Sequence, residues 1–179
     1  MERDPRRRSA SSSQPKLSGR TSAGPMNHDR ARQMEREIVA INASLEEIRN
    51  LWATAVGVSG PQWTILMALH ELDQGNGVPV KVVSKMLCVE SSFVSTQSKI
   101  LEKKGLMRRK QSGDDGRVVQ MSLTDKSYKQ IASLLPRQEA LNNFIFSDFS
   151  ELELSEFVRK LSILNARLEK AFLKVSMGI

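Results

Sequence analysis

The chain has 179 residues, a formal net charge of +7 and one cysteine, Cys88. This length suits one compact domain with a tail. A single cysteine excludes an internal disulfide and a zinc site built from four cysteines or from two cysteines and two histidines. No apolar run approaches the roughly 20 residues that span a bilayer, and the N-terminus lacks the apolar core of a secretory signal. We therefore expect a soluble, cytoplasmic protein.

The positive charge is concentrated in two parts of the chain. Residues 78–130 hold eleven Lys or Arg against five acidic residues, and residues 1–28 hold six against two. The segments 29–77 and 131–179 are acidic and neutral, respectively. This distribution predicts a polyanionic partner for residues 78–130, with nucleic acid as the leading candidate.

Residues 1–28 are predicted to be a disordered basic tail. They are rich in Arg and Ser and hold few large apolar side chains, so they cannot bury enough surface to offset the entropy of ordering. We favour a solvated tail, or an extension upstream of Met26. The alternatives are a basic arm that follows phosphates or enters a minor groove, and an organelle transit peptide, whose helical apolar face is missing here.

Residues 29–55 are predicted to form a helix, because apolar side chains recur at alternating steps of four and three. These side chains are Met34, Ile38, Ile41, Leu45, Ile48 and Trp52. A second helix is predicted over residues 61–73, with Pro61 in its first turn. Its buried face is expected to consist of Trp63, Leu66, Met67, Leu69 and Leu72.

After this helix, the segment 61–124 continues with two short helices and two strands. The first short helix is predicted over residues 80–87, with Val82, Val83, Met86 and Leu87 on its inner face. After a turn at residues 88–90, Ser91 or Ser92 is expected to cap the second, which ends at Gly105 and buries Phe93, Val94 and Leu101. Strands over residues 106–110 and 118–123 follow, joined by a polar loop. This order is typical of a winged helix-turn-helix, whose second helix enters a DNA groove.

The second short helix and the loop supply the candidate DNA contacts. Short hydroxyl side chains allow a helix to approach DNA closely, and lysines neutralise phosphates. A carboxylate two residues before an arginine can orient the guanidinium for a minor groove. The candidates are Ser91, Ser92, Ser95, Thr96, Lys99, Lys103, Lys110, Ser112, Asp115 and Arg117. The same helix face could be an ordinary solvated one, but the adjacent wing favours DNA. Asp114 and Asp115 do not indicate a catalytic pair, because no His or apolar pocket lies near them in sequence.

Residues 125–176 are predicted to be helical again, with Pro136 expected to kink or interrupt the helix and Ser150 expected to begin the last one. Its apolar residues repeat the four-three spacing of the first helix. Segments 29–55 and 125–176 are therefore expected to form a dimerisation region, since a reader of palindromic DNA needs two copies; packing within one chain is the alternative. The interface candidates are Ile38, Ile41, Leu45, Phe157, Leu161, Leu164 and Leu168.

Three strings over residues 29–175 resemble the MarR family of winged-helix transcriptional regulators. They are Gln62-Trp63-Thr64-Ile65-Leu66, the stretch from Val94 through Leu101-Glu102-Lys103-Lys104-Gly105-Leu106, and Asp115-Gly116-Arg117 followed by Leu123-Thr124. The resemblance implies an α+β, mostly α fold with a helical dimer region, operator DNA as partner, and a small-molecule or redox signal that lowers DNA affinity. By position, Arg117 would be the minor-groove arginine and Asp115 its orienting partner.

The sequence departs from the family pattern within the second short helix. Thr96 stands where many members have an arginine, so a bidentate guanine contact is lost and the operator cannot be inferred. Gln97 and Ser98 occupy positions that are often apolar, which makes the inner face of this helix unusually polar.

The resemblance also implies an effector site between the dimer helices and the winged domain, where family members bind aromatic acids, phenolic compounds or their thioesters. The candidate residues are Arg49, Trp52, Trp63, Met67 and His70. Arg49 would pair with a carboxylate or phosphate. For each of the other residues taken singly, core packing is the competing interpretation.

We thus expect a ligand-responsive repressor that binds a pseudo-palindromic operator as a homodimer, without a metal or cofactor. The chain lacks a phosphate loop, a nucleophile elbow and a His/acid constellation, so we do not expect an enzyme. A winged-helix protein-interaction module is one alternative. A thiol-based redox regulator acting through Cys88 is another, although a lone cysteine is more often a small packing residue.

Overall fold

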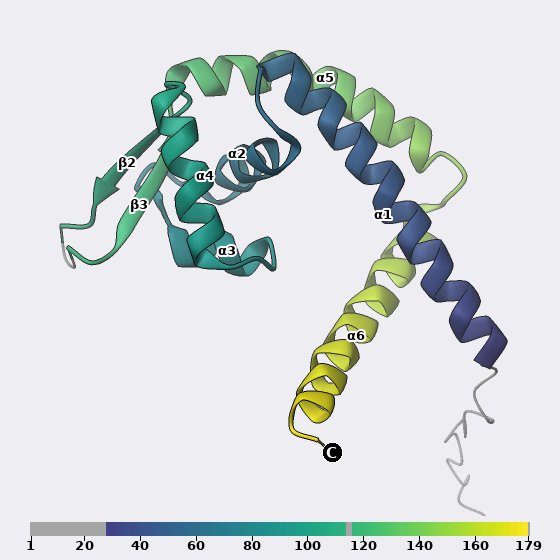
Figure 1. Ribbon diagram of the computed structural model, residues 1–179. Coiled ribbons are helices and arrows are strands. Elements are labelled where there is room, and N and C mark those ends of the chain that lie inside the picture. Colours follow the sequence, from purple (N-terminus) through teal and green to yellow (C-terminus); the bar gives the residue numbers. More distant parts are fainter. Residues whose placement is uncertain (1–27, 114–115, 179) are drawn as a thin grey trace, which may run out of the picture. The chain divides into compact units, whose positions relative to one another are not determined.

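A computed structural model of the chain describes residues 28–113 and 116–178. The predicted basic tail, apart from His28, lies outside the described residues, as do Asp114 and Asp115 in the wing. The chain divides into two compact units, Met1–Ala43 and Ser44–Ile179. The described elements of the second unit include the complete helix-turn-helix and its sheet (Figure 1).

Helix α1 spans His28–Val56, which confirms the helix predicted over residues 29–55. Its part in the first unit exposes the apolar side chains of Met34, Ile38 and Ile41. In the second unit, Ala53 and Val56 are buried in the hydrophobic core. Trp52 packs against that core, and the Arg137 guanidinium lies 5.6 Å from its ring centroid.

Helix α2 spans Gly60–Leu72 and supplies much of the core. Ser59 caps it through a capping box, in which the Ser59 side chain accepts from the Gln62 amide and the Gln62 side chain accepts from the Ser59 amide. This arrangement satisfies backbone donors that a helix start otherwise leaves free. Its core side chains are Trp63, Ile65, Leu66, Ala68 and Leu69.

Among the described residues, three short strands form one antiparallel sheet in the order β1-β3-β2. Strand β1 is Val78–Pro79, β2 is Met107–Gln111 and β3 is Val119–Leu123. In the hairpin, Met107 pairs with Leu123 and Gln111 pairs with Val119. The two strands of the hairpin match the predicted ones to within a residue, whereas β1 was not predicted.

Helices α3, Val80–Met86, and α4, Ser91–Lys103, form the helix-turn-helix. Gly105 follows α4 with a φ of +68°, the left-handed conformation expected of a helix-ending glycine. The predicted serine cap is wrong, because Glu90 is the N-cap residue and makes no side-chain cap bond. The buried residues of α3 are Val83 and Ser84, while Val82 and Met86 are exposed.

The buried face of α4 also differs from the expectation. Val94 and Leu101 are fully buried as predicted, but Phe93 is 39% exposed. Ser98 is buried in its place. Phe93 is about 100° from Val94 around the helix, which turns it away from the face that packs.

Helix α5 spans Asp125–Ile145 and is capped by the Thr124 side chain. The helix continues through Pro136 rather than ending there. Near its start, the buried Ser127 hydroxyl donates to the Leu106 carbonyl and joins α5 to the sheet. Helix α6, Glu151–Ser176, begins at Ser150 as predicted, and Ser150 forms a capping box with Glu153.

The observed architecture confirms the predicted class: mostly α, with a small antiparallel sheet beside a helix-turn-helix. In the described part of the chain, no helix has the length and apolar character needed to cross a membrane.

Candidate nucleic-acid interface

Helix α4 presents a polar face and a buried face that follow from its spacing. Ser92, Thr96, Lys99 and Lys103 are exposed and recur at steps of four and three, so they share one side of the helix. Ser91 is exposed and Ser95 half-buried at the edge of that side. The structure thus brings together the six α4 residues predicted to face DNA.

The opposite side of α4 is held by hydrogen bonds as well as by apolar contact. The Ser91 and Ser84 hydroxyl oxygens are 2.8 Å apart, and this hydrogen bond links the start of α4 to α3. Ser98 donates to the Ser95 carbonyl within the helix. Gln62 of α2 donates through Nε2 to Gln97 Oε1 at 3.1 Å. Since Ser91 is already engaged with Ser84, its hydroxyl is partly committed to the protein.

The β2–β3 hairpin forms the wing and stands beside α4 (Figure 1). At the base of the loop between β2 and β3, the Ser112 amide donates a hydrogen bond to the Val118 carbonyl at 2.8 Å. Lys110 and Arg117 are exposed and Ser112 is half-buried. The predicted orienting partner of Arg117, Asp115, is outside the described residues.

Glu102 of α4 joins the recognition helix to the wing. Its Oε1 accepts from the Arg109 amide at 3.2 Å, and its Oε2 lies 3.9 Å from Arg109 Nη1. The Arg109 side chain is only 13% exposed. A second ion pair, between Arg108 and Asp125 at 3.9 Å, is largely exposed and contributes little stability. Glu102 therefore ties α4 to the wing through both the backbone and the side chain of Arg109.

The predicted effector residues do not form one cluster in the second unit. Trp63 is 2% exposed and belongs to the core, and Trp52 and Met67 pack against that core. The His70 ring lies 6.2 Å from the ring of Tyr128, whose pKa is raised by burial and by the nearby Asp73 carboxylate. Their positions agree best with the packing interpretation.

Arg49 instead lines a cavity of about 240 Å³ between α1, α2 and the helix-turn-helix. Thr64 and Phe93 also line it, together with Leu87 and Val89. Neither Thr64 nor Phe93 was predicted to line an effector site, because the local sequence around each residue carries no sign of the cavity. A cavity of about 150 Å³ is enough for one benzene ring, so the volume of this cavity is sufficient for one aromatic ring.

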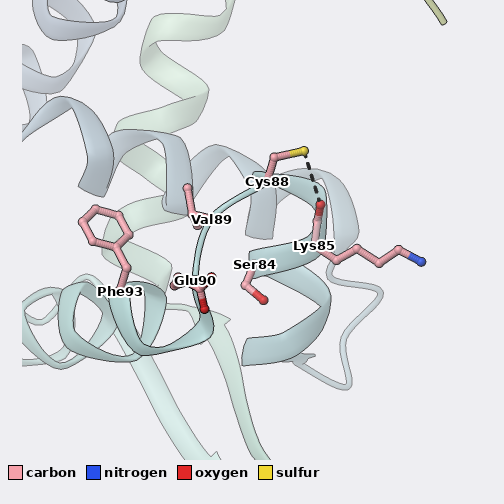
Figure 2. A pocket seen from close by; sticks show the side chains of 6 residues that line it. All are labelled: Ser84, Lys85, Cys88, Val89, Glu90 and Phe93. Carbon is pink, nitrogen blue, oxygen red and sulfur yellow. Dashed lines mark hydrogen bonds between the residues drawn. The ribbon is translucent and has the colours of Figure 1, made fainter. Parts of the chain in front are cut away.

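Cys88 lies on the rim of a shallower depression at the turn between α3 and α4, lined also by Ser84, Lys85, Val89, Glu90 and Phe93 (Figure 2). The thiol is exposed and donates weakly to the Lys85 carbonyl at 3.8 Å. The Lys85 side chain extends away from the sulfur (Figure 2). Cys88 has a φ of +54°, so its backbone adopts the left-handed conformation that the tight turn requires.

The predicted interface residues of α1 and α6 are largely uncovered in the single chain. Ile38, Ile41 and Leu45 are 41–53% exposed. On α6, Phe157, Leu161 and Leu168 are 39–57% exposed, and Leu164 is half-buried. None of the described α6 residues is buried. Apolar stripes of this length commonly mark an interaction surface.

Residues 58–119 match the model of the MarR family. The transcriptional repressor MprA of Escherichia coli (strain K12) is 28% identical over 127 residues, which cover 68% of this chain and 70% of MprA. A MarR protein from Peptoclostridium difficile DA00132 superposes with a TM-score of 0.67 at 21% identity, covering 79% of this chain and 91% of that one. The S. aureus MepR chain in a complex with DNA superposes with a TM-score of 0.65 at 19% identity, covering 73% of this chain and 93% of that one.

The solved structures share the fold, and the family match covers the helix-turn-helix with part of the wing. The relative MprA is a transcriptional repressor, and the S. aureus MepR structure is a complex with DNA. Residues 58–119 thus match the MarR family, and over most of its length the chain is similar to MarR-family proteins with a winged helix-turn-helix fold.

Proposed function

We propose that this regulator reads double-stranded DNA by inserting α4 into a major groove and the β2–β3 wing into the adjacent minor groove. The exposed face of α4 carries this proposal, because it combines small hydroxyl side chains with Lys99 and Lys103. A major groove about 12 Å wide admits an α-helix. The structure of MepR, which shares this fold, is a DNA complex, and this supports the assignment.

The contacts divide by chemistry into positioning and reading. Lys99, Lys103 and Lys110 neutralise phosphates, which fixes the protein on the duplex without reading sequence. Ser92, Ser95 and Thr96 meet base edges, and Ser91 and Ser112 contribute at the margins. Arg117 enters the minor groove. Because serine and threonine accept or donate to several bases, direct reading by α4 is permissive, and the wing and DNA shape add selectivity.

We further propose that two copies bind a pseudo-palindromic operator. In this assignment, segments 29–55 and 125–176 are the dimerisation region, and the exposed stripes of α1 and α6 are covered by the second copy. Two symmetric recognition helices then meet half-sites about 34 Å apart, one helical turn of DNA. Repression is the favoured outcome because the curated relative MprA is a transcriptional repressor.

The effector we propose is a small anionic aromatic acid or its acyl thioester, held in the cavity lined by Arg49, Thr64 and Phe93. Arg49 supplies the cation for a carboxylate, and Phe93 supplies an aromatic surface. Binding here would act on α4 directly, since Phe93 belongs to that helix. If Arg49→Ala leaves the response to every active aromatic acid unchanged while operator binding is intact, this effector site is wrong. His70 does not line this cavity, so His70→Ala tests separately whether that residue takes part in the effector response.

The test of the DNA proposal is repeated selection of duplexes from a random pool, followed by sequencing. We expect enrichment of one pseudo-palindromic motif with two half-sites. Binding without enrichment would leave only a basic protein with a winged fold. No binding even at low salt would refute DNA reading and favour a protein-interaction module, whose apolar interface is not weakened steeply by salt.

A further inference from the structure

A chain of hydrogen bonds ties the inner side of α4 to the junction between α1 and α2. Lys104, the residue after α4, donates through Nζ to the Gly57 carbonyl at 2.9 Å and to Gln62 Oε1 at 3.4 Å. Gln62 in turn donates through Nε2 to Gln97 Oε1 at 3.1 Å. Three side chains thus connect two separate elements through partners 35 or more residues apart in sequence.

The Gln62 side chain is a firm point of attachment. It is only 6% exposed, and its Oε1 also accepts from the Ser59 amide at 3.2 Å as part of the α2 capping box. An amide side chain that makes bonds from both ends is held in one orientation. A helix bound to Gln62 is therefore bound to the start of α2 rather than to a mobile surface group.

The two attached residues, Gln97 in α4 and Lys104 directly after it, lie along one line parallel to the helix axis. Gln97 and Lys104 are seven residues apart, which is about two turns and roughly 10 Å. Two attachments along one line resist rotation of the helix about its own axis. The exposed stripe of Ser92, Thr96, Lys99 and Lys103 lies roughly 100° or more around the same helix, so rotation would displace it directly.

We infer that Gln62, Gln97 and Lys104 are positioning residues that set the rotation of α4 and thereby the sequence specificity of the DNA reading proposed above, on which this inference rests. Side chains extend about 6 Å from the helix axis, so a rotation of about 10° moves their tips by roughly 1 Å. Base-edge hydrogen bonds do not survive such a shift. Long lysine side chains can follow a phosphate through it.

Two adjacent lysines offer a matched test. Lys103 lies on the exposed stripe, and Lys104 is bonded to Gly57 and Gln62. We expect Lys103→Met to weaken binding to the selected operator and to an unrelated duplex by the same factor, and to lower the salt slope. Lys104→Met removes the same charge, but it should lower operator affinity about tenfold with a much smaller change on the unrelated duplex.

Variants of Gln97 separate the hydrogen bond from general packing. Gln97→Leu removes the acceptor for Gln62 Nε2, and Gln97→Glu keeps an oxygen at that place. We expect Gln97→Leu to reduce the ratio of operator to unrelated binding as Lys104→Met does, and Gln97→Glu to retain most of that ratio. Gln74→Leu, at an exposed glutamine of the loop that follows α2, is the control and should retain it. Thermal melting of each variant verifies that it is folded.

Two outcomes overturn the positioning role while leaving DNA reading intact. One is that Lys104→Met and Lys103→Met weaken both duplexes by equal factors. The other is that Gln97→Glu loses as much discrimination as Gln97→Leu. A wild-type protein that does not discriminate the operator from the unrelated duplex overturns DNA reading itself, and the positioning role with it.

Discussion

Lys99→Gln is the substitution that examines the proposed interface most quantitatively. Lys99 is exposed in the middle of the polar stripe of α4, and no ion pair to it is found among residues 28–113 and 116–178. Glutamine retains a polar side chain and removes the charge. The substitution therefore deletes one proposed phosphate contact per protomer and no ion pair found in the described part of the chain.

The size of the effect follows from counterion release. Each neutralised phosphate contributes about 0.9 to the slope of the logarithm of affinity against the logarithm of salt concentration. Loss of one contact lowers the slope by about 0.9 for a bound monomer, and by about 1.8 for a dimer that carries the substitution twice. If variant and wild type bind equally at 1 M salt, these changes in slope correspond to losses of DNA affinity at 0.1 M salt of about eightfold and about 60-fold.

Fluorescence anisotropy with a labelled operator, at four or more salt concentrations, measures this slope. Lys170→Gln on α6 is the control, because it removes the same charge from an exposed position of a helix that we do not place on DNA. We expect its slope to equal that of the wild type. An unchanged slope in Lys99→Gln, or equal changes in both variants, would refute the assignment of this α4 face to phosphate contact.

Three further predictions concern the dimer, the turn and α6. Leu161→Glu should convert the protein to a monomer in sedimentation equilibrium, because it places a charge in the proposed interface. Lys170→Glu, on the opposite side of α6, should leave the protein dimeric. A dimeric Leu161→Glu variant would contradict the proposed interface. Cys88→Gly should be more stable to urea than Cys88→Ala by about 1 kcal/mol, because glycine tolerates the left-handed backbone at +54°; equal stabilities would show that the turn relaxes. The side-chain hydrogen bond from Arg159 lowers the pKa of Glu156 to about 2. The ionised carboxylate therefore stabilises the folded state above its ordinary pKa of 4.5, and this stabilisation is lost as the pH falls toward 2. Arg159→Met should return the pKa of Glu156 toward 4.5 in an NMR titration, and a titration that is the same in wild type and variant would exclude this ion pair in solution.

The long helices could be predicted because their signals are local. Apolar residues at steps of four and three fix one face of a helix whatever it packs against, and Ser150 with Glu153 forms a capping box within four residues. Strand β1 has only two residues, Val78 and Pro79. Its extended pairing depends on β3, more than 40 residues later, so no local pattern indicates it.

The inner face of α4 shows why residue type alone misled the prediction. Ser98 completes the three-four spacing of Val94 and Leu101 and is fully buried, whereas the apolar Phe93 is off that spacing and partly exposed. Position on the helix, rather than hydrophobicity, decided which side chain was buried. The bond between Gln62 and Gln97 joins residues on different helices, and neither residue carries a local sign of the other.

The central claim is tested most directly by the anisotropy of the DNA upstream of the protein's own gene, titrated with wild type and Arg117→Ala beside an unrelated duplex. We predict saturable, salt-sensitive binding of the wild type that favours the upstream DNA and is weakened by Arg117→Ala, because that residue is assigned to the minor groove. Absence of wild-type binding to either duplex at low salt would contradict the claim.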